Sequence, residues 1–148
     1  MFKWGLWILK IKRLHKDAVW PTRAKQGDAG FDLTAISMEY DQKTDTVVYE
    51  FGLSIQVPKG HFGMIVPRSS IYKTNMMLSN HCGIIDSGYT GPIKAIFRTF
   101  PTYKNEPYKV GDRVAQLILV PYYEPSLEEV DELDETERGD GGFGHSGR

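Results

Sequence analysis

The chain has 148 residues, of which 41% are hydrophobic, and its 18 basic and 19 acidic side chains leave a formal net charge of -1. This length suits one domain with its own core, and near-neutrality disfavours stable binding to nucleic acid. The single cysteine, Cys82, rules out an internal disulfide, and no Cys/His cluster has the spacing of a zinc site.

The beginning of the chain is apolar and basic. Residues 4–11 form its longest apolar stretch, far short of the ~20 residues that a membrane-spanning helix needs. Basic residues stand where a signal-peptide cleavage site needs small ones, so we expect a strand over residues 7–14, with Ile8 or Leu9 and Ile11 facing the core. Residues 1–7 are either an extra edge strand or a leader. We expect no membrane partner and a cytoplasmic location, in the host cell if a virus encodes the chain.

The middle of the chain consists of short apolar runs separated by turn sequences. The runs are rich in β-branched and aromatic residues, which favours strands, and their rhythm fits an all-β sandwich or barrel. They cover residues 46–51, 53–57, 63–66, 83–85, 93–97 and 114–120. Only residues 69–77 have a helical pattern, and Ser69 or Ser70 is placed to cap that short helix.

The end of the chain is acidic and then rich in glycine. Residues 121–148 carry nine acidic side chains against two arginines, and five of the last eleven residues are glycine. Such a tail cannot pack a core alone. It is either a disordered end or a mobile arm that becomes ordered on a ligand, where an aromatic ring stacks and Arg138 reaches phosphates. We therefore divide the chain into a β domain, residues 1–137, and a flexible arm, residues 138–148.

Two early segments carry candidate chemistry. Asp32 lies between apolar residues at an expected strand start after glycines, where it either stabilises a turn or serves a site. The segment Arg68-Ser69-Ser70 runs from a strand into the short helix. Its guanidinium, hydroxyls and amides suit a phosphate, although a helix cap beside a solvated arginine would have the same sequence.

Two later segments add to these. An apolar strand delivers Asp86 into a Gly-X-X-Gly turn, which predicts a β-hairpin with a carboxylate at its mouth, either a general base or a turn residue. Gln116 interrupts an apolar strand, so it needs a structural or a ligand partner. Arg113 is expected to pair with Asp112 or with another acid.

In order and spacing, these segments resemble the five motifs of the trimeric dUTPase family. The matching stretches are AGFDLTA, PRSS, GIIDSGYTG, GDRVAQLIL and RGDGGFGHSG. The resemblance implies a jelly-roll-like distorted β barrel with one short helix. It also implies a homotrimer with shared active sites, and Mg²⁺-assisted hydrolysis of dUTP to dUMP and pyrophosphate. That reaction limits uracil incorporation into DNA and supplies dUMP for dTMP synthesis.

The same resemblance implies roles for individual residues. Asp86 activates the water that attacks the α-phosphorus, and Asp32 holds the magnesium through metal-bound water. The hairpin of Asn80 and residues 83–85 reads uracil, and Tyr89 packs under the deoxyribose. The substrate-binding set is Arg68, Ser69, Ser70, Asn80, Gly83, Ile84, Ile85, Tyr89, Lys94, Gln116, Arg138, Phe143, Gly144 and Ser146, of which Phe143 stacks on the uracil.

One departure and two alternatives accompany this assignment. The second motif commonly ends in glycine, whereas this chain has Ser70 there. A sister class with the same fold deaminates dCTP and needs a glutamate where this chain has Ile96, so deamination is disfavoured. The other alternative is a nucleotide sensor without activity, because a fold does not determine a function. A pure binding protein has no use for the carboxylate of Asp86, which favours an enzyme.

Overall fold

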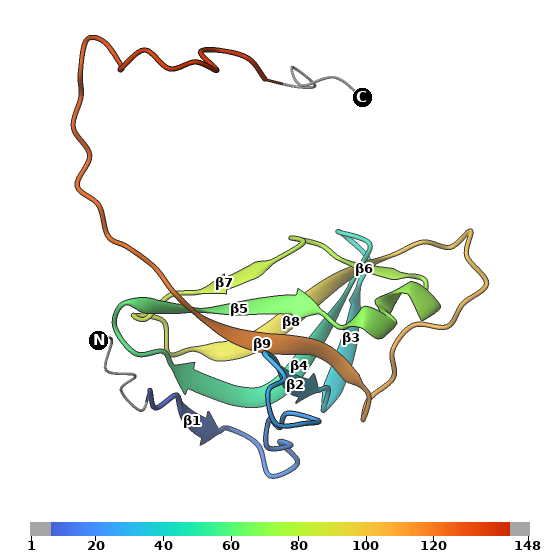
Figure 1. Ribbon diagram of the computed structural model, residues 1–148. Helices are drawn as coiled ribbons and strands as arrows, with labels where there is room; N and C mark the ends of the chain where they lie inside the picture. The colour runs from blue at the N-terminus through green and yellow to red at the C-terminus, as the bar shows by residue number, and fades with distance from the viewer. Residues whose placement is uncertain (1–6, 143–148) are drawn as a thin grey trace.

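A computed structural model describes residues 7–142. Its strands form two antiparallel sheets that face each other (Figure 1). One sheet has the order β1-β4-β8-β6, with β3 paired to β4, and the other has the order β2-β9-β5-β7. The elements are β1 Lys10–Arg13, β2 Phe31–Thr34, β3 Ser37–Asp41, β4 Thr46–Gln56, β5 His61–Pro67, the 3₁₀ helix η1 Ser69–Lys73, β6 Met76–Leu78, β7 Gly83–Ile85, β8 Pro92–Thr99 and β9 Arg113–Pro121.

The core lies between the two sheets because the strands alternate buried and exposed side chains. In β8, Ile93, Ala95 and Phe97 are buried, and the residues between them face outward. Phe97 packs edge-on against Tyr49 of β4, with ring centroids 5.6 Å apart. The predicted all-β class is confirmed, and within residues 7–142 the sheets stay open, as in a distorted β-clip, instead of closing into a barrel.

Strand β4 joins two runs that the sequence separates. Gly52 lies between them at a φ of +63°, and a Cβ there would come within 2.6 Å of Ile36. Glycine therefore lets one strand of 11 residues bend and continue. The strand pairs with β3 before the bend, with β1 after it, and with β8 on both sides, since Ser54 is opposite Pro92. In β1, Ile11 packs against the core together with the preceding Leu9, whereas Ile8 is exposed.

The predicted helix over residues 69–77 is wrong in length and in its cap. η1 has five residues, its N-cap is Arg68, and no side chain caps it. Thr74 ends it: its hydroxyl donates to the Ile71 carbonyl and accepts from the Met76 amide, and Met76 already begins β6.

The predicted hairpin around Asp86 is also wrong. β7 pairs with β5 in one sheet, whereas β8 pairs with β4 and β6 in the other. Residues 86–91 therefore form a crossover between the sheets. The connection from β6 to β7, which contains Asn80, crosses between the sheets in the same way.

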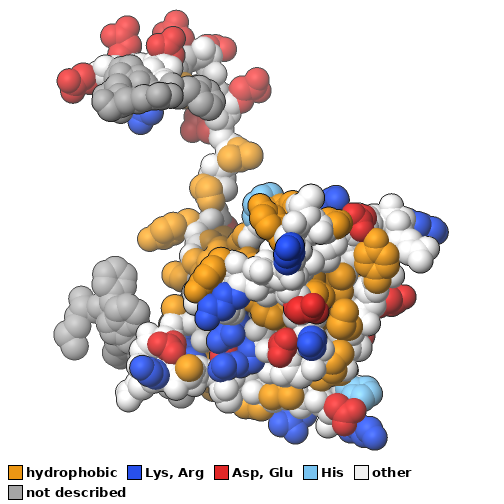
Figure 2. Space-filling view, turned by 90° about the vertical axis from the view of Figure 1, so that its right-hand side faces the viewer, with side chains coloured by type: hydrophobic (Ala, Val, Ile, Leu, Met, Phe, Trp, Pro, Cys, Tyr) orange, Lys and Arg blue, Asp and Glu red, His pale blue; other side chains and the backbone are white. Residues whose placement is uncertain are grey.

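The chain leaves the body after β9. Residues 122–142, the extended C-terminal segment, have no helix or strand and arch above the sheets (Figure 1). Figure 2 shows acidic side chains gathered on this segment, clear of the body. Within the part of the chain that is described, no helix is long and apolar enough to cross a membrane.

Candidate active site

Asp32 is brought to residues far away in sequence by strand pairing. Within one sheet, β9 lies between β2 and β5. Asp32 is opposite Gln116, and Pro67, which precedes Arg68, is opposite Ala115. The first, second and fourth motifs therefore meet on three adjacent strands.

The Asp32 carboxylate binds two arginines, and we call these three residues the Asp32 cluster. Arg68 Nε donates to Asp32 Oδ1 at 2.7 Å, and Arg113 Nη1 donates to Oδ2 at 3.1 Å. The Asp32 side chain is only 13% exposed. Two guanidinium groups around one carboxylate leave a net charge of +1, which suits an anion such as phosphate.

Arg113 pairs with an acid other than Asp112, the second of the two partners that the sequence left open. Asp112 uses its carboxylate to accept from the Lys109 amide at 2.7 Å and so stabilises its own turn. Arg113 reaches back to Asp32 across the β2–β9 pairing instead. Local sequence could not choose between these partners, because Asp32 is 81 residues away in the chain.

Gln116 has a structural partner. Its Nε2 donates to the carbonyl of Pro67 at 3.0 Å, directly before Arg68. A Cβ at Gly30 would lie 2.2 Å from Gln116 Oε1, so Gly30 makes room for this side chain. Gln116 thus fixes the end of β5, from which Arg68 extends.

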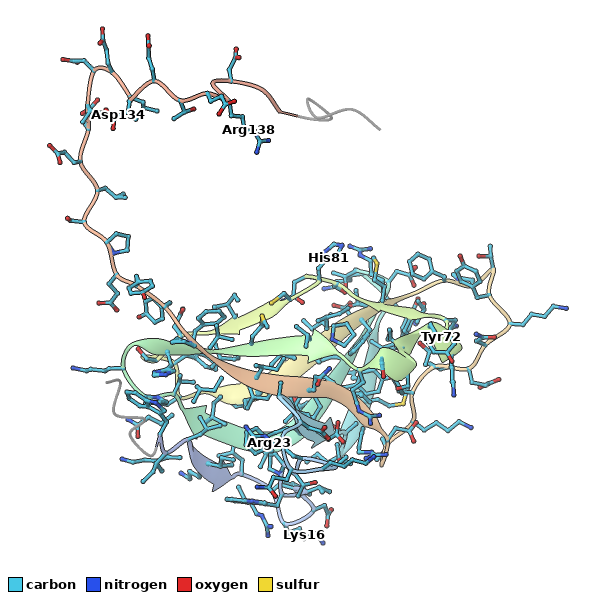
Figure 3. The ribbon with its side chains drawn as sticks, in the orientation of Figure 1. Lys16, Arg23, Tyr72, His81, Asp134 and Arg138 are labelled. Atoms are coloured by element: carbon cyan, nitrogen blue, oxygen red, sulfur yellow. The ribbon has the colours of Figure 1, made fainter. Side chains whose placement is uncertain are left out.

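The Arg68-Ser69-Ser70 turn continues from this strand end. Ser69 is exposed, and Ser70 is half-buried. The Ser70 hydroxyl lies 3.3 Å from that of Tyr108, a buried core residue that the sequence analysis missed. Figure 3 shows the neighbouring Tyr72 on η1, at the end of the sheets where this turn lies.

A second group of predicted residues surrounds a groove of about 450 Å³ beside the crossover from β7 to β8. Asp86 is exposed at this groove, and Ser87 and Gly88 follow it in the turn. The groove is lined by Ile84, Ile85, Asp86, Tyr89, Pro92, Ile93 and Lys94.

The turn after Asp86 holds the ring of Tyr89 in place. The Tyr89 hydroxyl donates to the Pro92 carbonyl at 2.8 Å, and its amide donates to the Asp86 carbonyl at 3.0 Å. A Cβ at Gly91 would lie 2.6 Å from the Tyr89 hydroxyl oxygen. Glycine at 91 therefore leaves the space that the tyrosine ring occupies.

Lys94 lies on the same groove and is paired. Its Nζ lies 2.6 Å from Glu50 Oε1, across the β4–β8 pairing. The hydrogen bond from Lys94 lowers the pKa of Glu50 below its ordinary value of 4.5, and that bond raises the pKa of Lys94 above 10.5. Like Tyr108, Glu50 is a residue that the sequence did not signal.

The turn of Asn80 precedes β7. His81 has a left-handed φ of +59°, and Figure 3 shows it at the upper edge of the body. Asn80 is exposed, and its side-chain nitrogen would lie 3.5 Å from a Cβ at Gly83. Asn80 therefore lies beside Gly83, the first residue of β7.

The start of the extended C-terminal segment lies close to Asp86. A hydrogen bond from the Tyr122 hydroxyl to Glu124 raises the pKa of Tyr122, and the charge of Asp86 adds to this effect. Farther along, Arg138 Nε donates to the Gly141 carbonyl, within the segment itself (Figure 3). Phe143, Gly144 and Ser146 lie outside the described residues.

The two groups remain separate in one chain. Among residues 7–142, no hydrogen bond or ion pair joins the Asp32 cluster to Asp86, Tyr89 or Lys94. No described group of three or more His, Cys, Asp or Glu side chains could hold a metal ion. A lone carboxylate between two arginines does not suit a bare cation, but it fits magnesium that arrives on a triphosphate, because phosphate oxygens and water then supply the remaining ligands.

Comparisons with known proteins agree on one family. A family model described as dUTPase matches residues 16–147. Two relatives named deoxyuridine 5'-triphosphate nucleotidohydrolase come from Escherichia phage T5 and Paramecium bursaria Chlorella virus 1. The first is 34% identical over 95% of this chain and 99% of its own length. The second is 39% identical over 94% and 97%. The structure of Staphylococcus bacteriophage 80alpha dUTPase with dUpNHpp superposes with a TM-score of 0.78 at 27% identity, over 95% of this chain and 99% of that one.

Proposed function

Because this chain belongs to the dUTPase family and is thus an enzyme of the dUTP diphosphatase class, we propose that it splits dUTP into dUMP and pyrophosphate, with magnesium. The main observation in support of the proposal is the carboxylate of Asp86, which is exposed on a groove that Tyr89 and Lys94 also line. A carboxylate with free lone pairs beside a nucleotide can accept a proton from water.

In the proposed chemical step, Asp86 acts as the general base. The water oxygen bonds to the α-phosphorus, its proton passes to Asp86, and the bond from the α-phosphorus to the bridging oxygen breaks. Pyrophosphate leaves with that oxygen and its electron pair. Asp86 is then protonated and returns the proton to solvent, to which its side chain is open.

Arg68 and Arg113 offer positive charge for the triphosphate, and Asp32 keeps both guanidinium groups in place. Asp32 is also the residue that would hold the magnesium, through metal-bound water. Magnesium, when bound, neutralises charge on the phosphate oxygens. Ser69 and Ser70 complete the phosphate-binding turn.

Base and sugar selection use the groove. Asn80 and the backbone of β7 pair with the uracil edge, where a tight fit excludes a 5-methyl group and cytosine presents the wrong donors. The ring of Tyr89 packs under the deoxyribose. Since the hydrogen bond to Pro92 holds that ring in the space that Gly91 leaves open, a ribose 2′-hydroxyl would clash with it.

The shape of the chain favours a homotrimer with shared sites. The Asp32 cluster and the groove are separate in one chain, and the extended C-terminal segment rises away from its own body (Figure 1). In the proposed trimer, the arm of residues 138–148 closes a site: Phe143 stacks on uracil, while Arg138, Gly144 and Ser146 contact the phosphates. We place the enzyme in the cytoplasm.

Deamination of dCTP is the second candidate reaction, and Ile96 argues against it. Ile96 faces outward from β8 and is 43% exposed, so the position that needs an acid–base group has an apolar side chain. Hydrolysis through Asp86 needs no group there.

A nucleotide panel tests the proposed function. Purified protein with magnesium should release pyrophosphate from dUTP far faster than from dCTP, dTTP or UTP. Equal rates on UTP and dUTP would contradict the role of Tyr89. Ammonia release from dCTP would overturn dUTP hydrolysis in favour of deamination. The absence of any turnover would contradict the proposal that this protein is an active enzyme.

A further inference from the structure

Tyr108 is held at three points in the core. Its side chain is buried, and its ring lies edge-on to Phe97 with centroids 6.1 Å apart. Its carbonyl accepts from the Tyr49 hydroxyl at 2.7 Å, and its amide donates to Met76 Sδ at 3.4 Å. Burial raises the pKa of Tyr49, so its hydroxyl stays protonated and remains a donor. The position of the Tyr108 ring is therefore well determined.

The hydroxyl of this fixed ring reaches the phosphate-binding turn. It lies 3.3 Å from Ser70 Oγ, and either hydroxyl can be the donor. Ser70 follows Arg68 by two residues, and the Arg68 guanidinium binds Asp32. A continuous set of contacts thus runs from the aromatic core to the Asp32 cluster.

The turn needs such a support. η1 has only five residues, none of which is buried, and no side chain caps its N-terminus. A 3₁₀ helix of this length has poor hydrogen-bond geometry and contributes little stability of its own. Ser70, where the resembling motif commonly has glycine, supplies the hydroxyl that connects the turn to Tyr108.

We propose that Tyr108 is a positioning residue for phosphate binding: through Ser70, its hydroxyl holds the Arg68-Ser69-Ser70 turn in the shape that receives the triphosphate. This inference rests on the proposed dUTP hydrolysis. Ser70 then acts by fixing the turn, and Tyr108 touches neither substrate nor metal.

The test compares Tyr108→Phe, Ser70→Ala and the double variant with wild type in dUTP hydrolysis. Since one neutral hydrogen bond is lost, each single variant should raise KM for dUTP about 2- to 10-fold and leave kcat nearly unchanged. The double variant should be no worse than either single one, because both remove the same contact. Ser70→Thr keeps a hydroxyl, so its KM for dUTP should be close to that of wild type.

Two controls separate positioning from general damage. Tyr72→Phe removes the hydroxyl of a 75% exposed tyrosine in the same helix and should leave KM unchanged. Competitive inhibition by deoxyuridine, which has no phosphate, should be equal in wild type and Tyr108→Phe. If Tyr108→Phe folds poorly, Ser70→Ala provides the same comparison at a less buried site.

Different results contradict the two proposals. A wild-type protein without dUTP hydrolysis would overturn the proposed function. A wild type that hydrolyses dUTP, with an unchanged KM in Ser70→Ala and Tyr108→Phe, would overturn this inference alone. Additive effects in the double variant, or weaker inhibition by deoxyuridine, would also overturn it.

Discussion

Asp32 and Asp86 lie on or beside strands of the same sheet, yet their surroundings are opposite. Asp32 is 13% exposed and lies between two guanidinium groups. Asp86 is exposed on a groove, and no ion pair to it occurs within residues 7–142. The two carboxylates belong to one residue type and occur in comparable glycine-rich segments, so local sequence does not distinguish them.

The difference separates a binding role from a chemical one. The oxygens of Asp32 already accept hydrogen bonds from Arg68 and Arg113, so in the proposed reaction this side chain positions two positive charges for the triphosphate. Asp86 has lone pairs free for a water molecule, which a general base requires. Substitutions should therefore affect turnover at one aspartate and substrate affinity at the other.

The largest expected effect comes from Asp86→Asn. The amide keeps the shape of the side chain but accepts a proton poorly, so kcat should fall about 10²- to 10⁴-fold. Binding of dUpNHpp, measured by calorimetry, should stay close to wild type. If the variant hydrolyses dUTP at the wild-type rate, Asp86 is not the general base.

Deletion of residues 138–148 should have the next largest effect. Without the arm, the site at Asp86 stays open to water and the substrate is held less well, so turnover should fall about 10- to 100-fold. The circular dichroism spectrum and the oligomeric state should not change. Full activity of the truncated chain would show that this arm is only a disordered end.

Asp32→Asn should act mainly on substrate affinity. It removes the charge that holds Arg68 and Arg113, so KM for dUTP should rise about 10-fold, with a smaller change in kcat. Asp28→Asn is the matched control, because Asp28 only accepts from the Lys25 amide in an exposed turn. An unchanged KM in Asp32→Asn, or equal effects of both substitutions, would contradict the assignment.

The ion pair of Glu50 and Lys94 should have the smallest effect, and this effect is on stability. Exposed ion pairs add only about 0.2–1 kcal/mol to the free energy of unfolding, because water and salt screen them. Since the pKa of Glu50 is lowered below 4.5, Glu50 stabilises the folded protein fully above pH 4.5. This stabilisation is lost as the pH falls through the lowered pKa. The pKa of Lys94 is raised, so its contribution is full below 10.5 and is lost above the raised value.

Thermal unfolding of wild type and Glu50→Gln at several pH values tests this pH dependence of stability. Wild type should have a slightly higher Tm at pH 7, and the difference should shrink as the pH falls below 4.5 and through the lowered pKa of Glu50. A difference in Tm that does not shrink with falling pH would show that packing, and not charge, causes it.

Local sequence was most informative about the position of the apolar runs. The run over residues 83–85 has the bounds of β7, and the run over residues 93–97 lies within β8. The sequence did not signal β3, because this edge strand pairs on one side and its central residues, including Met38 and Tyr40, are exposed. A buried alternation, the signal that identifies a strand, does not exist there.

The sequence by itself determined the all-β class, most strand positions and the order of the motifs, since these follow from local alternation, turn residues and spacing. Only the tertiary structure decided which groups meet. It placed β7 and β8 in different sheets, paired Arg113 with Asp32 instead of Asp112, and brought Tyr108 to Ser70. These contacts depend on strand pairing between residues far apart in sequence, which no local pattern specifies.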